Sequence, residues 1–171
     1  DTVLKLSSLM SLKALLDEDR DVSKKILQEF LDPFVKSVFQ LLSQVEEEET
    51  KVALLYLLSI FIERMHRLIL PYVPTLMHYV PSLWNTSADE QMIRNAIISV
   101  LTRLVDTMGE ESTSIHHFIL PLIRYTTDVD NEDHLYYIED GLQLWQSTMH
   151  QAPHCTDAIL ELFTNIPKTL N

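Results

Sequence analysis

The chain has 171 residues, of which 46% are hydrophobic, and a formal net charge of −12 at pH 7. That apolar content supports a sizeable core and is not the composition of a disordered protein. The excess of acid argues against a nucleic-acid surface, because such a surface needs lysine and arginine to displace counterions from phosphate. It favours basic partners instead.

The sequence contains two glycines, Gly109 and Gly141, and one cysteine, Cys155. A sheet with many hairpins or a nucleotide-binding loop normally needs more glycine. A single cysteine excludes an intrachain disulfide and fits a reducing compartment. The most apolar run, over residues 52–62, is too short to cross a bilayer, because that takes about 20 residues. The chain begins without a signal peptide or an initiator methionine, and we expect it to be a piece of a longer protein.

Apolar residues recur at helical spacing through the chain. The pattern predicts a helix over residues 3–16 and a second over 22–45 with a break near Pro33. A third helix, over 51–67, is apolar on nearly every side, so we expect neighbours to cover it on more than one face. Thr50 is its predicted N-cap.

The segment 69–84 reads as an amphipathic helix that contains prolines. Its apolar residues share one helical face: Ile69, Val73, Leu76, Val80 and Leu83. Pro71 fits a first helical turn, whereas Pro81 should bend the helix because it removes a hydrogen bond. Similar proline-opened apolar segments surround Pro33 and Pro121. Three such segments at intervals of about 40–50 residues indicate stacked helical pairs.

The next helix is predicted over residues 88–108, with a capping box formed by Ser87 and Glu90 at its start and Gly109 as a left-handed stop. Its apolar residues repeat those of the helix over 51–67 at a distance of 43 residues. The matched positions are Leu54 with Ile97, Leu57 with Val100, Leu58 with Leu101, Phe61 with Leu104, and Ile62 with Val105. A further shift of about 44 residues matches Leu101 with Trp145 and Val105 with Met149.

Helices over 115–125 and 134–151 follow, the second one despite Gly141. Glycine costs roughly 1 kcal/mol inside a helix relative to alanine, so we expect close helix packing to explain it. Thr156 is predicted to cap a last helix that ends near Pro167.

These elements predict an all-α fold, an α-solenoid of HEAT repeats with about four antiparallel helix pairs. The predicted pairs cover residues 1–45, 50–84, 88–125 and 131–170. A single pair cannot bury its apolar faces alone, so stacking supplies the core.

Acidic residues concentrate in the predicted connections between pairs. In a stack these connections line up along one edge, and an acidic edge attracts partners rich in lysine and arginine. The alternative is that each connection is an ordinary solvated turn. The candidate residues for binding cargo or another partner are Glu46, Glu47, Glu48, Glu49, Asp89, Glu90, Asp128, Asp130, Glu132 and Asp133.

No metal or cofactor site is predicted. The three aspartates between residues 17 and 21 imitate the start of a calcium loop, but Val22 and Gln28 stand where that loop needs glycine and glutamate. The acidic loop 128–133 lacks the glycine too. The neighbours His116 and His117 point about 100° apart on a helix, which favours surface histidines over metal ligands.

No nucleophile, base and orienting group stand at a spacing typical of catalysis, and Cys155 beside His154 is weak evidence. The sequence therefore predicts a protein that is not an enzyme.

Several short motifs are similar in content and order to one known family. They are Ile62-Glu63-Arg64, Pro71-Tyr72-Val73, Ser82-Leu83-Trp84, Leu120-Pro121, Thr127-Asp128-Val129 and Leu135-Tyr136-Tyr137-Ile138-Glu139-Asp140-Gly141-Leu142-Gln143-Leu144-Trp145. Over about residues 34–167 the chain resembles the importin-β (karyopherin) family of nuclear transport receptors.

This resemblance implies a HEAT superhelix whose proline-opened helices lie on the concave side. It also implies a receptor that binds basic or folded protein cargo, shuttles between cytoplasm and nucleus, and passes the nuclear pore on phenylalanine-glycine nucleoporins. Ran-GTP would bind through repeats outside this segment, so the resemblance places no Ran-binding residue here. It implies no catalysis, no direct contact with nucleic acid and no membrane. The main alternative is a HEAT scaffold for protein assembly that is unrelated to Ran.

Overall fold

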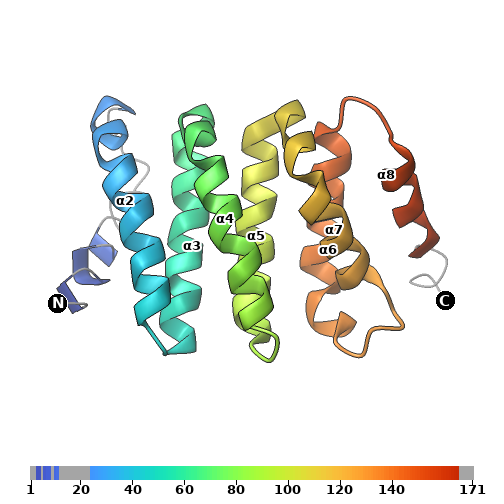
Figure 1. Cartoon of the computed structure of the whole chain (residues 1–171), viewed down its shortest axis with the longest axis horizontal. Coiled ribbons are helices and arrows are strands. Elements are labelled where there is room, and N and C mark those ends of the chain that lie inside the picture. The colour runs from blue at the N-terminus through green and yellow to red at the C-terminus, as the bar shows by residue number, and fades with distance from the viewer. Residues whose placement is uncertain (1–2, 5, 9, 12–23, 166–171) are drawn as a thin grey trace.

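The computed structural model describes residues 3–4, 6–8, 10–11 and 24–165, and the regular elements within them are all helices (Figure 1). The α-helices from residue 24 onward are α2 (Lys24–Gln44), α3 (Glu48–Met65), α4 (Val73–Thr86), α5 (Gln91–Met108), α6 (His116–Thr127), α7 (His134–Gln151) and α8 (Asp157–Leu162). Three 3₁₀ segments accompany them: η1 (His66–Tyr72), η2 (Gly109–Ile115) and η3 (Phe163–Asn165). The calcium-like loop at 17–21, half of the predicted helix 3–16 and the end of the predicted last helix lie outside the described residues.

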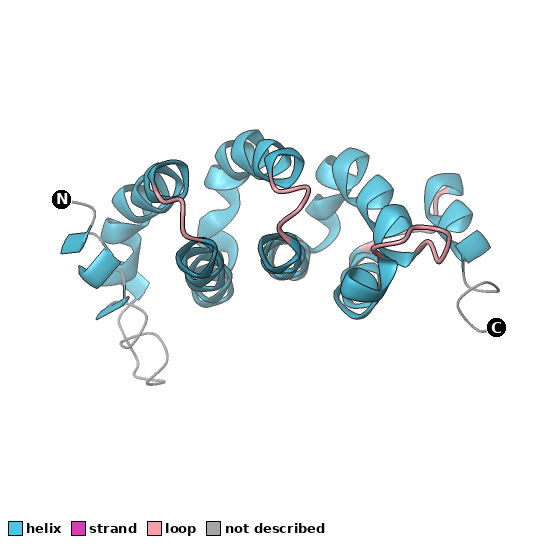
Figure 2. Ribbon diagram, turned by 90° about the horizontal axis from the view of Figure 1, so that it is seen from below, coloured by secondary structure: helices cyan, strands magenta, loops and turns pink. Residues whose placement is uncertain are grey.

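The helices form two layers, and the row is gently arched (Figure 2). The inner layer contains α3, α5 and α7, which pack directly on one another; the outer layer contains α2, α4, α6 and α8. This arrangement confirms the predicted α-solenoid. The proline-opened helices α4 and α6 lie on the outer side of the arch, opposite to the side that the resemblance implied.

The inner helices α3 and α5 each carry many buried apolar side chains. Helix α3 is buried on several sides, as its sequence predicts, because α2 covers one face and α5 another. The positions matched at 43 residues are all buried in both α3 and α5, and Trp145 is buried in α7. The sequence repeat therefore marks one structural position, the helix that forms the inner layer.

Contacts join α2 with α3, α4 with α5, and α6 with α7. Helix α4 follows α3 through η1, which contacts both helices. The predicted pairs over residues 1–45, 50–84, 88–125 and 131–170 stay a prediction.

Prolines are accommodated differently from what the pattern predicts. Helix α2 continues through Pro33, so the predicted break is absent. Helix α4 starts at Val73, and Pro74 occupies its first turn while Pro71 belongs to η1. Pro81 lies inside α4, as predicted.

Gly141 lies where α7 crosses α6. A Cβ atom at this position would stand 2.3 Å from the Thr126 Oγ1 atom and 2.7 Å from its Cβ atom. Thr126 is itself fully buried, so it has little room to move. Close packing of two helices therefore explains this glycine, as the sequence predicts.

The inner helices α3 and α5 end in the same way. Gly109 has φ 62° and ψ −136°, and its N–H donates to the carbonyl of Val105. His66, 43 residues earlier, has φ 48° and ψ −137°, and its N–H donates to the carbonyl of Ile62. This backbone conformation suits glycine, as predicted for Gly109, but it strains a residue with a Cβ atom. His66 therefore occupies a glycine position.

We expect the substitution His66→Gly to raise the free energy of unfolding by about 1 kcal/mol, because it removes this strain at an exposed site. The reciprocal change Gly109→Ala should lower it by a similar amount; the nearest atom to the new Cβ is 3.8 Å away, so strain alone decides the effect. Denaturant unfolding of the two variants measures both changes. A destabilised His66→Gly variant would contradict the assignment.

Candidate partner-binding surface

The three acidic connections lie along one edge of the stack (Figure 1, lower edge). They join α2 to α3, α4 to α5 and α6 to α7, whereas η1 and η2 lie at the opposite edge. This follows from the antiparallel order, in which alternate connections return to the same side. We call the ten acidic residues predicted above the acidic edge.

Six residues of the acidic edge are exposed to solvent: Glu46, Glu47, Glu49, Asp89, Asp130 and Glu132. The other four are partly buried: Glu48, Glu90, Asp128 and Asp133. Each connection therefore presents at least one exposed carboxylate. Binding of a partner here stays a prediction.

Some of the glutamates of the first connection stabilise the N-terminus of α3. Glu48 and Glu49 lie in the first turn, where the helix dipole favours negative charge. Glu47 is the N-cap residue, and its carboxylate accepts a hydrogen bond from the Thr50 hydroxyl. The prediction of Thr50 as N-cap is therefore wrong, because the helix begins at Glu48, three residues before its predicted start.

The second connection ends at Glu90, the residue before α5. The Glu90 carboxylate lies 3.5 Å from the Lys51 ammonium group, which ties this connection to α3. Ser87 is buried and makes no cap, since its N–H continues the hydrogen bonding of α4 to Leu83. The predicted capping box is therefore wrong.

The third connection is the longest and is shaped by its own polar side chains. The Asp128 carboxylate accepts from the Asp130 N–H at 3.1 Å, and the Asn131 amide oxygen accepts from the Asp133 N–H at 3.2 Å. The Asn131 amide group also donates to the Tyr125 carbonyl at 3.1 Å. Asp128 and Asn131 thus fix the loop, while Asp130 and Glu132 point their charge outward.

A buried arginine lies behind the second and third connections. Arg94 is 8% exposed, and its guanidinium stands 4.4 Å from the centre of the Trp84 ring and 5.7 Å from that of Tyr125. It donates to the Tyr125 hydroxyl at 3.2 Å and to the Trp84 carbonyl at 3.4 Å. Cation–π contacts of this kind stabilise a desolvated arginine. Arg94 therefore joins α4, α5 and α6.

The sequence analysis did not single out Arg94, and it named Trp84, which is buried, only as part of a short motif. The available signal was an arginine on the apolar side of a helix, directly after Ile93. Tyr137 closes the cluster, with its ring centre 6.2 Å from Trp84 and 6.1 Å from Tyr125. Burial raises the pKa of the Tyr137 hydroxyl.

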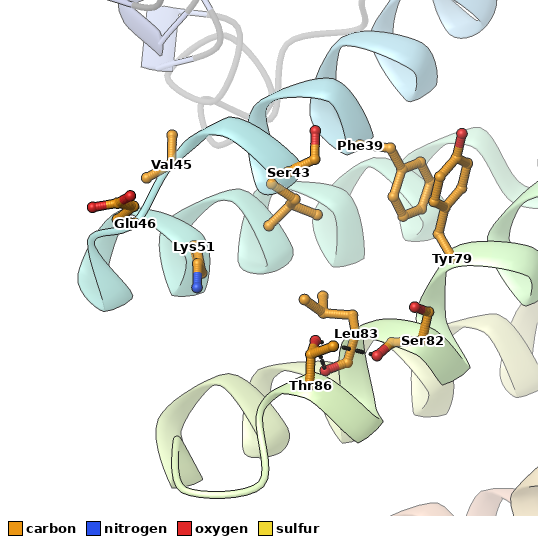
Figure 3. A pocket seen from close by; sticks show the side chains of 10 residues that line it. Phe39, Ser43, Val45, Glu46, Lys51, Tyr79, Ser82, Leu83 and Thr86 are labelled. Atoms are coloured by element: carbon orange, nitrogen blue, oxygen red, sulfur yellow. Dashed lines mark hydrogen bonds between the residues drawn. The ribbon is translucent and has the colours of Figure 1, made fainter.

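Grooves lie between neighbouring helices of the outer layer. The groove between α2 and α4 has a volume of about 430 Å³ and is crossed by the stacked rings of Phe39 and Tyr79, whose centres are 4.6 Å apart (Figure 3). Glu46 and Lys51 line the end of the groove that lies beside the acidic edge. The structure thus places an apolar groove next to the first acidic connection.

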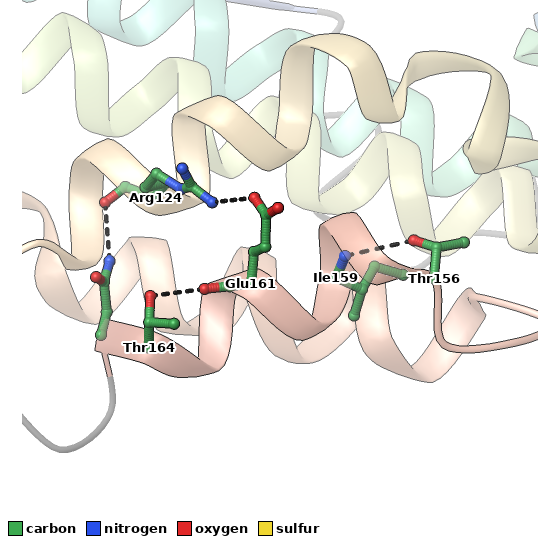
Figure 4. Close-up of polar contacts among 6 residues, drawn as sticks. Arg124, Thr156, Ile159, Glu161 and Thr164 are labelled. Carbon is green, nitrogen blue, oxygen red and sulfur yellow. Dashed lines mark hydrogen bonds and ion pairs between the residues drawn. The ribbon is translucent and has the colours of Figure 1, made fainter.

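The second groove, of about 680 Å³, lies between α6 and α8. The Arg124 guanidinium donates to the Glu161 carboxylate at 2.6 Å across it (Figure 4). Thr156 caps α8, as predicted, by accepting from the Ile159 N–H at 3.3 Å. His116 lines this groove, and its Nε2 atom is buried without a hydrogen-bond partner.

Among the described residues, no group of three or more histidine, cysteine, aspartate or glutamate side chains is arranged to hold a metal ion. Within the same part of the chain, no helix is both long and apolar enough to span a membrane.

Comparisons with known proteins agree with this architecture. Residues 95–171 match a family described as importin-11-like, TPR repeats. The human and mouse proteins named importin-11 are each 37% identical over 170 residues, which is 99% of this chain and 17% of theirs. The importin beta-like protein KAP120 of Saccharomyces cerevisiae is 25% identical over 150 residues, 85% of this chain and 14% of its own length. No solved structure matches the chain.

The stacked helices and these relatives define a helical-repeat segment of the importin-β type, which confirms the resemblance found in the sequence. More narrowly, the chain is similar to importin-11 along nearly its whole length, and residues 95–171 match the importin-11-like family. It spans about a sixth of the length of the importin-11 proteins that it matches.

The buried His116 makes stability depend on pH. Burial lowers the pKa of its imidazole below the ordinary value of 6.5, so the folded state binds a proton more weakly than the unfolded state does. The stabilising contribution is complete above about pH 6.5 and is lost as the pH falls below that value. We expect His116→Gln to reduce this acid sensitivity.

Thermal unfolding of the original chain and of the variant between pH 7.5 and pH 5 tests this expectation. His117→Gln, at the exposed neighbouring residue, is the control and should retain the acid sensitivity of the original chain. If the unfolding temperature depends on pH in the same way for the original chain and for His116→Gln, the expected role of His116 is refuted.

Proposed function

We propose that this chain is a segment of a nuclear import receptor that helps to hold protein cargo, and that it takes no part in catalysis. The observation that supports this most strongly is the similarity to importin-11 along 99% of the chain. The receptor would shuttle between cytoplasm and nucleus through the nuclear pore. Phenylalanine-glycine nucleoporins would be its partners in the pore, and Ran-GTP would bind through repeats outside this segment.

The proposed mechanism is electrostatic capture on a flexible stack. The exposed carboxylates of the acidic edge attract a basic surface of a folded cargo, and the inner helices offer further contact area. Each repeat contacts mainly its neighbours, so small changes between helices add up to a change in pitch that can release the cargo. Neither nucleic acid nor a membrane is a partner in this proposal.

Neutralising the acidic edge should weaken cargo binding. The edge variant carries Glu46→Gln, Asp89→Asn, Asp130→Asn and Glu132→Gln, which removes exposed charge from all three connections. We expect a basic cargo to bind the complete receptor about tenfold more weakly at physiological salt, with a smaller difference at high salt. Calorimetric titration of the full-length receptor measures both.

A matched control removes four exposed charges elsewhere, with Glu29→Gln, Asp106→Asn, Glu110→Gln and Asp157→Asn. It makes the net charge less negative by the same amount but leaves the acidic edge intact, so cargo affinity should change little. If both variants lose cargo affinity equally, the loss is due to net charge alone, which contradicts a specific role for the acidic edge.

Binding of the complete receptor to Ran separates the proposal from a scaffold that is unrelated to transport. We expect tight binding to Ran loaded with GTP and at least about a hundredfold weaker binding to Ran loaded with GDP, because a switch needs differential affinity. Biosensor measurements with both nucleotide forms give the two affinities. Equal affinities, or no binding of either form, would favour the scaffold.

A further inference from the structure

The last turn of α2 carries an exposed serine hydroxyl shortly before the run of four glutamates, Glu46–Glu49. Ser43 is exposed, and its hydroxyl donates only to the carbonyl of Gln40, at 2.8 Å within the same helix. The helix ends one residue later, and Glu46–Glu49 begin three residues after Ser43. The Ser43 side chain also lines the groove between α2 and α4 (Figure 3).

We propose that Ser43 is a phosphorylation site for an acid-directed serine/threonine kinase. A kinase of this class recognises carboxylates that follow the acceptor residue, and basic residues of the kinase bind them. The Ser43 Oγ atom attacks the γ-phosphorus of ATP and forms the new O–P bond, while the bond from that phosphorus to the β,γ-bridging oxygen breaks. ADP leaves, and the hydroxyl proton passes to the catalytic base of the kinase.

Access to the kinase follows from the position at a helix end. The acceptor must leave the helix to enter an active site, and terminal turns open at low cost. Ser43 lies in the last turn of α2, and the three residues 45–47 after the helix are not helical. Only one hydrogen bond of the hydroxyl is broken.

Other hydroxyls along this edge meet fewer of these conditions. Thr86, 43 residues later at the end of α4, precedes two carboxylates, Asp89 and Glu90, and its hydroxyl donates to the carbonyls of both Ser82 and Leu83. Thr127 precedes the third connection but is buried. Ser82 lines the same groove as Ser43, and no carboxylate occurs in the four residues after it. Ser43 is therefore the favoured acceptor.

The phosphate would add about 1.5 to 2 negative charges beside the first acidic connection. We expect this charge to strengthen the attraction between the acidic edge and a basic partner, an expectation that rests on the proposed function. One added exposed ion pair corresponds to about threefold tighter binding. The Lys51 ammonium lines the same groove and offsets part of the repulsion from the neighbouring glutamates.

The first experiment measures phosphate transfer alone. The full-length receptor is incubated with ATP and an acid-directed serine/threonine kinase, and mass spectrometry of its peptides locates the phosphate. We expect phosphate on Ser43 and none on Ser82. Replacing Glu46, Glu47 and Glu49 by glutamine should reduce incorporation at Ser43 by about tenfold, because the carboxylates guide the kinase.

Ser43→Ala should abolish incorporation at this position, and Ser43→Thr, which keeps an acceptor hydroxyl, should retain it. Absence of phosphate from Ser43, or incorporation that is unchanged after the glutamates are replaced, would overturn the proposal. Neither result depends on cargo or on Ran, so this experiment is independent of the proposed function.

The second experiment compares binding of a lysine-rich peptide to the phosphorylated and unphosphorylated receptor, with kinase-treated Ser43→Ala as control. About threefold tighter binding of the phosphorylated form supports the expected effect of the added charge. Equal affinity of the two forms contradicts that effect. If neither form binds the peptide, the proposed role of the acidic edge fails, while phosphate found on Ser43 still establishes the modification site.

Discussion

Direct packing of α3, α5 and α7 is the interaction on which the rest of this structure depends. Helices α3 and α5 contribute buried leucine, isoleucine, valine and phenylalanine side chains at positions 43 residues apart, and α7 adds the buried Trp145. Such a row has no single centre, because each helix is covered by the one before it and the one after it. The outer helices complete the cover and leave grooves between them, since they stand on the outer side of an arch.

The inner row also decides where charge can accumulate. Each inner helix is joined to an outer helix by a short connection, and these connections return to one edge. Carboxylates placed there remain in solvent and do not disturb the core. Some of them also serve the fold, as Glu47 does at the start of α3 and Asp128 does in its turn. The acidic edge is therefore both a consequence of the repeat and the part of it best suited to a charged partner.

The repeat itself could be predicted from the sequence, because apolar spacing reports burial and burial is what the inner layer shares. Gly109, Gly141 and the Thr156 cap were also predictable, since each has one dominant local cause. Helix starts were less predictable. Ser87 looks like a cap, yet it lies buried at the end of α4 because tertiary packing overrides the local motif.

Two further features needed the structure. The strained backbone of His66 was hidden, because its residue type gives no sign of a glycine position. The cluster around Arg94 was hidden too, because its rings come from segments up to 53 residues apart. The side of the arch on which the proline-opened helices lie depends on packing between layers, which no local pattern encodes.

The contact between Gly141 and Thr126 has a consequence for how this sequence can evolve. Any side chain at position 141 collides with Thr126, and removing only the threonine hydroxyl still leaves a Cβ atom 2.7 Å from the new one. Gly141 can therefore be replaced without a large loss of stability only if residue 126 is first replaced by glycine or if the two helices move apart. Substitutions at positions 126 and 141 are therefore coupled, and both depend on the distance between α6 and α7.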